Sequence, residues 1–280
     1  MADDITPLAS LSITHVYYNP TDPLSTLAAF LSLLPQGLCV VYATLLWSTR
    51  EAEVLLMFAG QLACEGVNLV LKRLIKEERP PHRALGAGSG RGYGMPSSHA
   101  QFAFFWAVAA GLFLCVRHRP RPLGGVGLVT AAGGGDGGGN VQRAYRLGGL
   151  SAAAASIEAY SHSHWTLAQR AVASAGALLV AGMVAWSRVY LEYHSVRQVL
   201  AGCAAGAGCA VAWFAVTYLM REMGLVAWAL DMPLARWLRM RDLVVVEDLC
   251  QAGWEKWEER RRVALEKDRE REKAKAGKGQ

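Results

Sequence analysis

Three short clusters of polar residues, each at the end of an apolar segment, contain side chains suited to binding phosphate. They lie at residues 72–80, 96–99 and 187–194. Lys72, Arg79 and Arg188 supply three cations, and a guanidinium group can bind two phosphate oxygens at once. Ser97 stands where an apolar segment begins, so it is placed to cap a helix whose first N–H groups point at an anion. Together these residues predict an anion pocket.

The second and third clusters each contain one histidine. His99 and His194 can gain or lose a proton near neutral pH. Two histidines in a cationic pocket suit phosphoryl transfer, in which positioning and charge stabilisation provide most of the catalysis. The clusters contain no cysteine and no aspartate, and their only acids are Glu77, Glu78 and Glu192. Because these acids form no carboxylate cluster for Mg²⁺, we expect a reaction that uses neither a metal nor another cofactor.

The apolar residues that must position these clusters fall into five long blocks. Hydrophobic residues make up 52% of the chain and charged residues only 19%, and the blocks cover 25–47, 54–70, 98–116, 171–187 and 199–220. A helix needs about 20 mostly apolar residues to cross a bilayer, and no block has the polar stripe of a soluble helix. We therefore expect an all-α, polytopic transmembrane helix bundle with about five spans, four to six being possible.

With five spans, the connecting loops alternate between the two sides of the membrane, and all three polar clusters fall on one side. Most lysines and arginines fall on the other side, mainly at 117–168 and after residue 221. Basic residues favour the cytoplasmic side. We therefore expect residues 1–24 to be a non-cytoplasmic segment, 25–222 a transmembrane domain and 223–280 a charged cytoplasmic tail. The formal net charge of +6 then reflects topology rather than binding to nucleic acid.

Two further segments look peripheral to the bundle. Residues 124–164 are rich in glycine and alanine, which predicts a low-complexity insertion between the third and fourth spans. His162 and His164 in this insertion could bind a metal, although a solvated loop is the simpler interpretation. From Trp254 onward, acidic and basic residues alternate, which predicts an exposed charged helix.

The spacing of the three clusters resembles that of the phosphatidic acid phosphatase type 2 family. Its signature is Lys-x6-Arg-Pro, Pro-Ser-Gly-His and Ser-Arg-x5-His-x3-Asp. Residues 72–80 match the first motif in full, whereas Ser98 replaces the glycine of the second and Gln198 the aspartate of the third. Residues 93–102 and 187–194 resemble the branch that acts on dolichyl diphosphate, in which glutamine also takes this position. The resemblance extends over about residues 14–242, apart from the insertion.

The resemblance implies a role for each matching residue. His194 would attack phosphorus and become a phosphohistidine. His99 would protonate the departing oxygen and then activate water. The phosphate oxygens would be bound by Lys72, Arg79, Arg188, Ser97 and the backbone at Ser98.

The residue that orients His194 is less clear from the sequence. Gln198 can accept a hydrogen bond from the imidazole ring, but it brings no charge to the position of the family aspartate. Glu65 lies seven residues before Lys72, which is about two helical turns away on nearly the same face. Glu65 could supply the missing negative charge or pair with Lys72, and pairing is the interpretation we prefer.

As a whole, the resemblance implies an enzyme of the endoplasmic reticulum membrane with its active site facing the lumen. It would hydrolyse dolichyl diphosphate, a polyprenyl diphosphate, to dolichyl phosphate and phosphate, which recycles the lipid carrier of protein N-glycosylation. The alternatives are a phosphatase for phosphatidate, a sphingoid phosphate or a soluble phosphomonoester, and a non-catalytic carrier of lipid phosphates. A carrier would need only the cations, so the two histidines favour an enzyme.

Overall fold

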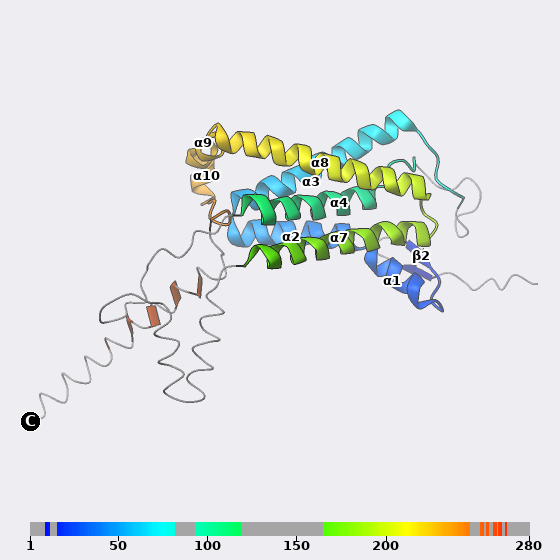
Figure 1. Ribbon diagram of the computed structural model, residues 1–280, viewed down its shortest axis with the longest axis horizontal. Helices are drawn as coiled ribbons and strands as arrows, with labels where there is room; N and C mark the ends of the chain where they lie inside the picture. The colour runs from blue at the N-terminus through cyan, green and yellow to red at the C-terminus, as the bar shows by residue number, and fades with distance from the viewer. Residues whose placement is uncertain are drawn as a thin grey trace, which may run out of the picture. The chain divides into compact units, whose positions relative to one another are not determined.

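The computed structural model describes residues 9–11, 16–81, 93–118 and 165–246, with single residues between 253 and 267. The predicted insertion at 124–164 lies outside this part of the chain. The helices are α1 Pro23–Leu31, α2 Leu34–Thr49, α3 Ala52–Ile75, α4 Ser98–Leu112 with the π-helical turn η1 Phe113–Arg117, α7 Leu167–Tyr190, α8 Val196–Glu222, α9 Leu225–Asp231 and α10 Pro233–Trp237 (Figure 1). All of them belong to one compact unit, formed by Met1–His118 and Leu167–Asp242.

The remaining segments, Arg119–Thr166 and Leu243–Gln280, form a second unit. Its residues that the structure describes between 253 and 267 are helical. Within them, the rings of Trp254 and Trp257 pack with their centroids 4.9 Å apart.

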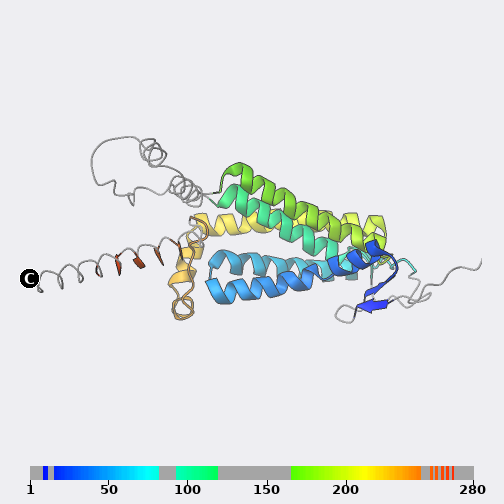
Figure 2. The same cartoon turned by 90° about the horizontal axis from the view of Figure 1, so that it is seen from below.

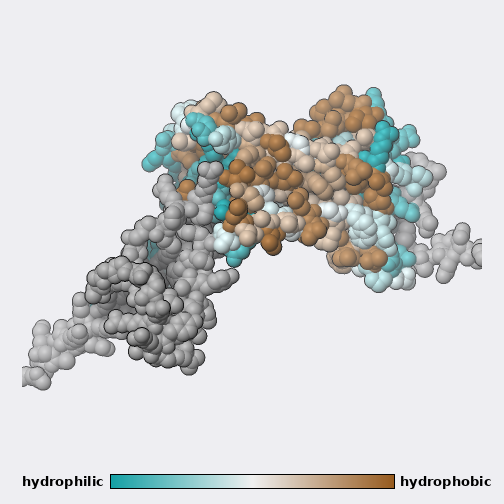
Figure 3. Space-filling view, viewed as in Figure 1, coloured by the Kyte–Doolittle hydropathy of each residue, from teal (hydrophilic) through white to brown (hydrophobic). Residues whose placement is uncertain are grey.

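Five segments are long and apolar enough to cross a membrane, which confirms the predicted number of spans. They are Pro23–Thr49, Ala52–Ile75, Ser98–Arg117, Leu167–Tyr190 and Val196–Glu222. On the face shown in Figure 3, hydrophobic residues cover much of the middle of the bundle and hydrophilic residues gather toward its ends. Val172 and Leu179 on α7 are 72% and 70% exposed, as expected for side chains that contact lipid. The chain is a multi-pass membrane protein.

The first span consists of two helices rather than the single helix that its sequence predicts. α1 ends at Leu31 and α2 begins at Leu34, with Pro35 in the first turn of α2. Proline has no N–H group, so it cannot continue the hydrogen-bond ladder of α1 across the junction. Asp22 fixes where α1 begins, because its side chain accepts hydrogen bonds from two N–H groups of the first turn.

A short antiparallel hairpin precedes α1. Its strands are β1 Ala9–Leu11 and β2 Val16–Tyr18, paired so that Ala9 lies opposite Tyr18. The sequence predicts only a non-cytoplasmic segment here, because three-residue strands are too short to produce a periodic pattern.

Helix α4 packs against α3, α7 and α8 (Figures 1 and 2). Its N-terminal half approaches α8 closely where α8 has glycines. A Cβ atom at Gly206 would lie 2.2 Å from the carbonyl oxygen of Gln101, and one at Gly202 would lie 2.6 Å from that of Ser97. Small residues let helix backbones approach in this way, and here they fix the start of α4 against the start of α8.

A buried polar network joins α3 to α4 near the same end. The amide of Asn68 donates to Gln101 Oε1 at 2.7 Å, and Gln101 Nε2 donates to the carbonyl oxygen of Cys64 at 2.9 Å. Asn68 and Gln101 have no exposed surface. Because buried polar groups are costly unless they are bonded, this network favours one register of α3 against α4.

The opposite end of the bundle is held by ion pairs. The carboxylate of Glu53 lies 2.5 Å from Arg117 Nη1 and 2.7 Å from Arg221 Nη2. Arg221 also forms an ion pair with Asp242. These contacts connect α3, η1 and α8 to the segment that follows α10.

Candidate active site

The structure brings the three polar clusters to one end of the bundle, where α3 and α7 end and α4 and α8 begin (Figure 1). The predicted site residues occupy these helix ends as follows: Lys72 in the last turn of α3, Arg79 beyond it, Ser97 at the N-cap of α4, Ser98 and His99 in its first turn, Arg188 in the last turn of α7, His194 in the following turn, and Gln198 in the first turn of α8. Glu65 lies farther along α3.

The cations and the histidines are close enough to interact electrostatically. The charges of Arg188 and Lys72 act on His99. Those of Arg188, Arg79 and Lys72 act on His194. The five groups therefore share one site, although they come from three clusters that are distant in the sequence.

Several buried polar atoms of this site have no hydrogen-bond partner within the part of the chain that the structure describes. They are Arg79 Nε, Ser97 Oγ, His99 Nε2, and Nε and Nη1 of Arg188. Arg188 is only 4% exposed, and a buried charge is expensive unless it is paired. An anion with several oxygens is the ligand that would satisfy guanidinium and hydroxyl donors together.

The N-terminus of α4 adds further donors to the site. Ser97 holds the N-cap position as expected, but its side chain makes no capping hydrogen bond. Its N–H group instead donates to the carbonyl oxygen of Gln198 at 3.1 Å, which ties α4 to α8. The hydroxyl of Ser97 and the N–H groups of the first turn, including that of Ser98, therefore stay available to an anion.

The turn between α7 and α8 places His194 beside Arg188. The N–H groups of Tyr193 and His194 both donate to the carbonyl oxygen of Arg188, at 3.1 and 3.2 Å. Glu192 has a φ angle of 58° in this turn, a left-handed conformation that costs a non-glycine residue about 1 kcal/mol. The chain reversal that brings the His194 imidazole close to the Arg188 guanidinium group thus depends on an unfavourable backbone angle at Glu192.

The imidazole of His194 is 3% exposed, and its environment keeps it uncharged. Burial, followed by the nearby charges of Arg188 and Arg79, lowers the pKa of His194 to about 3. At neutral pH the ring therefore retains a lone pair on one nitrogen. Its Nδ1 lies 3.2 Å from Gln198 Oε1, which leaves Nε2 as the ring nitrogen that faces away from this contact.

Glu65 lies farther from Lys72 than an ion pair requires. Within the described part of the chain, its Oε1 atom is buried without a hydrogen-bond partner. In the described residues, no ion pair within 4.0 Å joins it to Lys72, although the two charges interact at longer range. Gln198, by contrast, contacts His194 directly.

Two residues of the site were not singled out for it by sequence reasoning. Glu77 accepts a hydrogen bond from Gln198 Nε2 at 3.0 Å. Tyr193 places its ring 4.5 Å below the guanidinium carbon of Arg188, a cation–π contact, and its hydroxyl accepts from the N–H of Tyr17 at 2.8 Å. The sequence signal for each residue was its position inside a polar cluster, Glu77 in the first and Tyr193 in the third.

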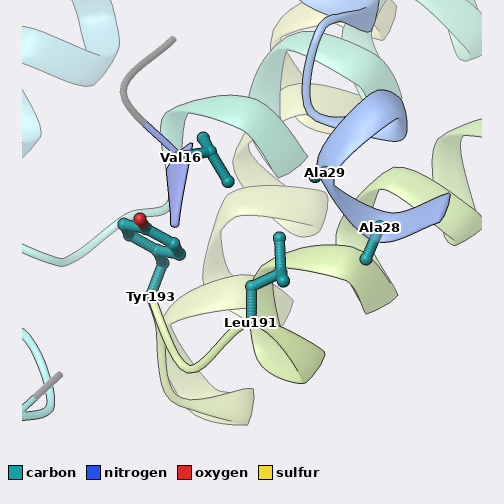
Figure 4. Close-up of a cluster of buried hydrophobic side chains, with 5 residues drawn as sticks. All are labelled: Val16, Ala28, Ala29, Leu191 and Tyr193. Atoms are coloured by element: carbon teal, nitrogen blue, oxygen red, sulfur yellow. The ribbon is translucent and has the colours of Figure 1, made fainter. Parts of the chain in front are cut away.

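Tyr193 also connects the site to the N-terminal hairpin. Figure 4 shows its ring next to Val16 of β2, with Leu191 facing Ala28 and Ala29 of α1. All five side chains are buried. The hairpin and α1 therefore stabilise the turn that carries His194.

No three His, Cys, Asp or Glu side chains are close enough to hold a metal ion among the residues that the structure describes. His162 and His164 lie outside those residues. The chemical groups gathered at this end of the bundle are cations, hydroxyl and N–H donors, and two imidazoles.

Comparisons with known proteins agree with the motif spacing. A model of the PAP2 superfamily matches residues 52–222, which include all three clusters. A Neurospora crassa protein, provisionally named a dolichyldiphosphatase, is 57% identical over 98% of this chain and 100% of its own length. Human dolichyldiphosphatase 1 is 35% identical over 74% of this chain and 71% of its own. The Saccharomyces cerevisiae dolichyldiphosphatase is 28% identical over 82% and 79%, respectively. No solved structure matches. The chain belongs to the PAP2 superfamily, the phosphatidic acid phosphatase type 2 family.

Proposed function

We propose that this protein is a membrane phosphatase that hydrolyses dolichyl diphosphate to dolichyl phosphate and phosphate through a phosphohistidine on His194. One observation carries the proposal. Among the described residues, buried guanidinium, hydroxyl and imidazole atoms from all three clusters lack protein partners, and they converge at one end of the bundle. The dolichyldiphosphatase names of its relatives support the choice of substrate.

In the first step, the lone pair on Nε2 of His194 attacks the terminal phosphorus. An N–P bond forms while the bond from phosphorus to the bridging oxygen breaks. His99 donates a proton to that oxygen, so dolichyl phosphate departs with the electron pair of the broken bond. An uncharged His194 is required for this attack, and the low pKa of its ring provides it.

In the second step, water attacks the phosphohistidine and gives up a proton to His99. The N–P bond breaks, its electron pair returns to Nε2, and phosphate is released. Both histidines are then in their starting states, and one water has been consumed for each diphosphate bond cleaved.

The cations bind the transferred group in both steps. Arg188 and Arg79 present guanidinium nitrogens that have no partner in the segments the structure describes, and Lys72 interacts electrostatically with both histidines. In phosphoryl transfer, such groups stabilise charge on the equatorial oxygens. Ser97 and the N–H groups at the start of α4 complete the set of donors.

The cellular setting belongs to the same proposal. We place the enzyme in the endoplasmic reticulum membrane with its active site toward the lumen and its tail in the cytoplasm, where dolichyl phosphate is returned for protein N-glycosylation. The names of its relatives support the compartment, and the bias of lysine and arginine toward the opposite end supports the orientation.

The test is phosphate release by purified protein in detergent. Wild-type protein given dolichyl diphosphate should release phosphate, and His194→Ala should lower kcat by about a hundredfold or more. His118→Ala is the matched control because His118 follows η1, at the end of the bundle opposite the site, and its kcat should stay within about twofold of wild type. Faster release from phosphatidate or a sphingoid phosphate would change the substrate. Near-normal turnover by His194→Ala would refute the nucleophile.

A further inference from the structure

Resting on the proposed function, we propose that Glu77 supplies, through Gln198, the negative charge that stabilises His194 when its ring becomes cationic during phosphoryl transfer. Glu77 would be a positioning residue that never touches the substrate. The observation behind the proposal is a continuous chain of hydrogen bonds from the imidazole to a carboxylate. His194 Nδ1 lies 3.2 Å from Gln198 Oε1, and Gln198 Nε2 lies 3.0 Å from Glu77 Oε1.

The orientation of the Gln198 amide is fixed by two backbone groups. Its oxygen accepts from the N–H of Ser195 at 3.3 Å, and its nitrogen donates to the carbonyl oxygen of Glu78 at 2.7 Å. A backbone N–H can only donate and a backbone carbonyl can only accept. A reversed amide would oppose both of them, and it would also direct its oxygen at the Glu77 carboxylate.

The fixed amide determines which nitrogen of His194 carries the proton. Gln198 Oε1 can only accept, so Nδ1 must be the donor in this contact. Nε2 is then unprotonated and can attack phosphorus. The side chain of Gln198 is 1% exposed, so water does not compete effectively for either end of the amide.

The need for a negative charge follows from what surrounds the ring. A histidine that carries phosphate on Nε2 and keeps its proton on Nδ1 has a positively charged ring. Arg188, Arg79 and Lys72 already act on His194 with like charge. The neutral amide of Gln198 offers only a dipole, whereas the half-buried carboxylate of Glu77 offers a full charge behind the buried amide and imidazole.

The loop that contains Glu77 is built to hold this contact. The carbonyl oxygen of Glu77 accepts from the N–H of Gly94 at 2.7 Å. Gly94 is buried against Gln198, because a Cβ atom there would lie 2.8 Å from both Nε2 and Oε1 of the amide. The close packing of Gly94 therefore holds the Gln198 amide in its position between Glu77 and His194.

The experiment separates the charge of Glu77 from its hydrogen bond. Glu77→Gln keeps an acceptor for Gln198 but removes the charge, so kcat for dolichyl diphosphate should fall about tenfold while KM changes less than about twofold. The control Glu222→Gln removes an exposed carboxylate at the last residue of α8, the end of that helix away from the site, and it should leave kcat within about twofold. A kcat of Glu77→Gln within twofold of wild type would overturn the proposal.

A charge exchange provides the second readout. In Glu77→Gln combined with Gln198→Glu, the carboxylate lies directly against His194 and the amide lies behind it. If charge is what matters, the double variant should exceed each single variant in kcat by about threefold or more, which is a coupling that independent structural effects would not produce. A double variant no faster than the slower single variant would refute the charge role. An inactive wild-type protein would instead refute the proposed function itself.

Discussion

Gly94 offers a sharp test of how closely the amide of Gln198 must be held, and Gly94→Ala is the perturbation. The new methyl carbon would lie 2.8 Å from both amide atoms of Gln198 and 2.9 Å from Cγ of Arg79. To reach an ordinary contact of about 3.4 Å, the amide must move by roughly 0.6 Å. The hydrogen bond from His194 is already 3.2 Å long, and a shift of that size would break it.

The expected loss follows from the value of that hydrogen bond. A net contribution of about 0.5–1.5 kcal/mol corresponds to a kcat up to about tenfold lower. Phosphate release from dolichyl diphosphate by detergent-purified protein, normalised to folded protein, is the assay. Gly66→Ala is the control, because nothing lies within 4 Å of a Cβ atom at that position of α3.

A further comparison tests the cause rather than the size of the effect. In a Gln198→Ala background the added methyl group no longer meets the amide, so Gly94→Ala should cost less than it does in the wild-type protein. Equal losses in both backgrounds would mean that Arg79, rather than Gln198, is displaced. Wild-type kcat in Gly94→Ala itself would show that the amide need not be held at this position.

Two further predictions concern stability. Arg188→Met should abolish activity but leave thermal stability unchanged or raised, because it removes a buried charge that has no carboxylate partner among the described residues. Arg117→Met, by contrast, should lose about 3 kcal/mol because it leaves Glu53 with one partner fewer. A destabilised Arg188→Met would contradict this reasoning. The pKa of His194 is about 3 in the folded protein against an ordinary 6.5, so folding opposes its protonation and stability should fall as pH drops from about 6.5 toward 3. His194→Asn should therefore lose less Tm than wild type between about pH 7 and pH 4.5, and identical losses would rule out this source of acid sensitivity.

The sequence predicts the site largely because membrane spans alternate in direction. Once the five apolar blocks are identified, the end of the second, the start of the third and the end of the fourth must face one side of the membrane. Lys72, His99 and Arg188 are therefore brought to one end without any knowledge of helix packing. Only three-dimensional contacts can show which of their atoms lack partners.

Glu77 escaped prediction because helical periodicity ends just before it. α3 stops at Ile75, and Lys76 follows with a φ angle of 53°, so the direction of the next side chain cannot be extrapolated from the helix. Glu65 attracted attention for the opposite reason, since it lies on a regular helix at a countable distance from Lys72. The ion pairs of Glu53 were equally invisible, because their partners Arg117 and Arg221 are far apart in the sequence.

The two ends of the bundle use arginine in opposite ways, and the difference explains how one helix bundle combines a stable fold with a reactive site. Arg221 is held by Glu53 and Asp242, so its charge is satisfied within the protein and has little left to offer a ligand. Arg188 is as deeply buried as a core residue, yet its guanidinium group contacts the ring of Tyr193 rather than a carboxylate. A carboxylate at that position would stabilise the fold but would also compete with phosphate. In the proposed mechanism, the carboxylate of Glu77 lies behind the amide of Gln198, so it would support a cationic imidazole without neutralising the guanidinium group of Arg188.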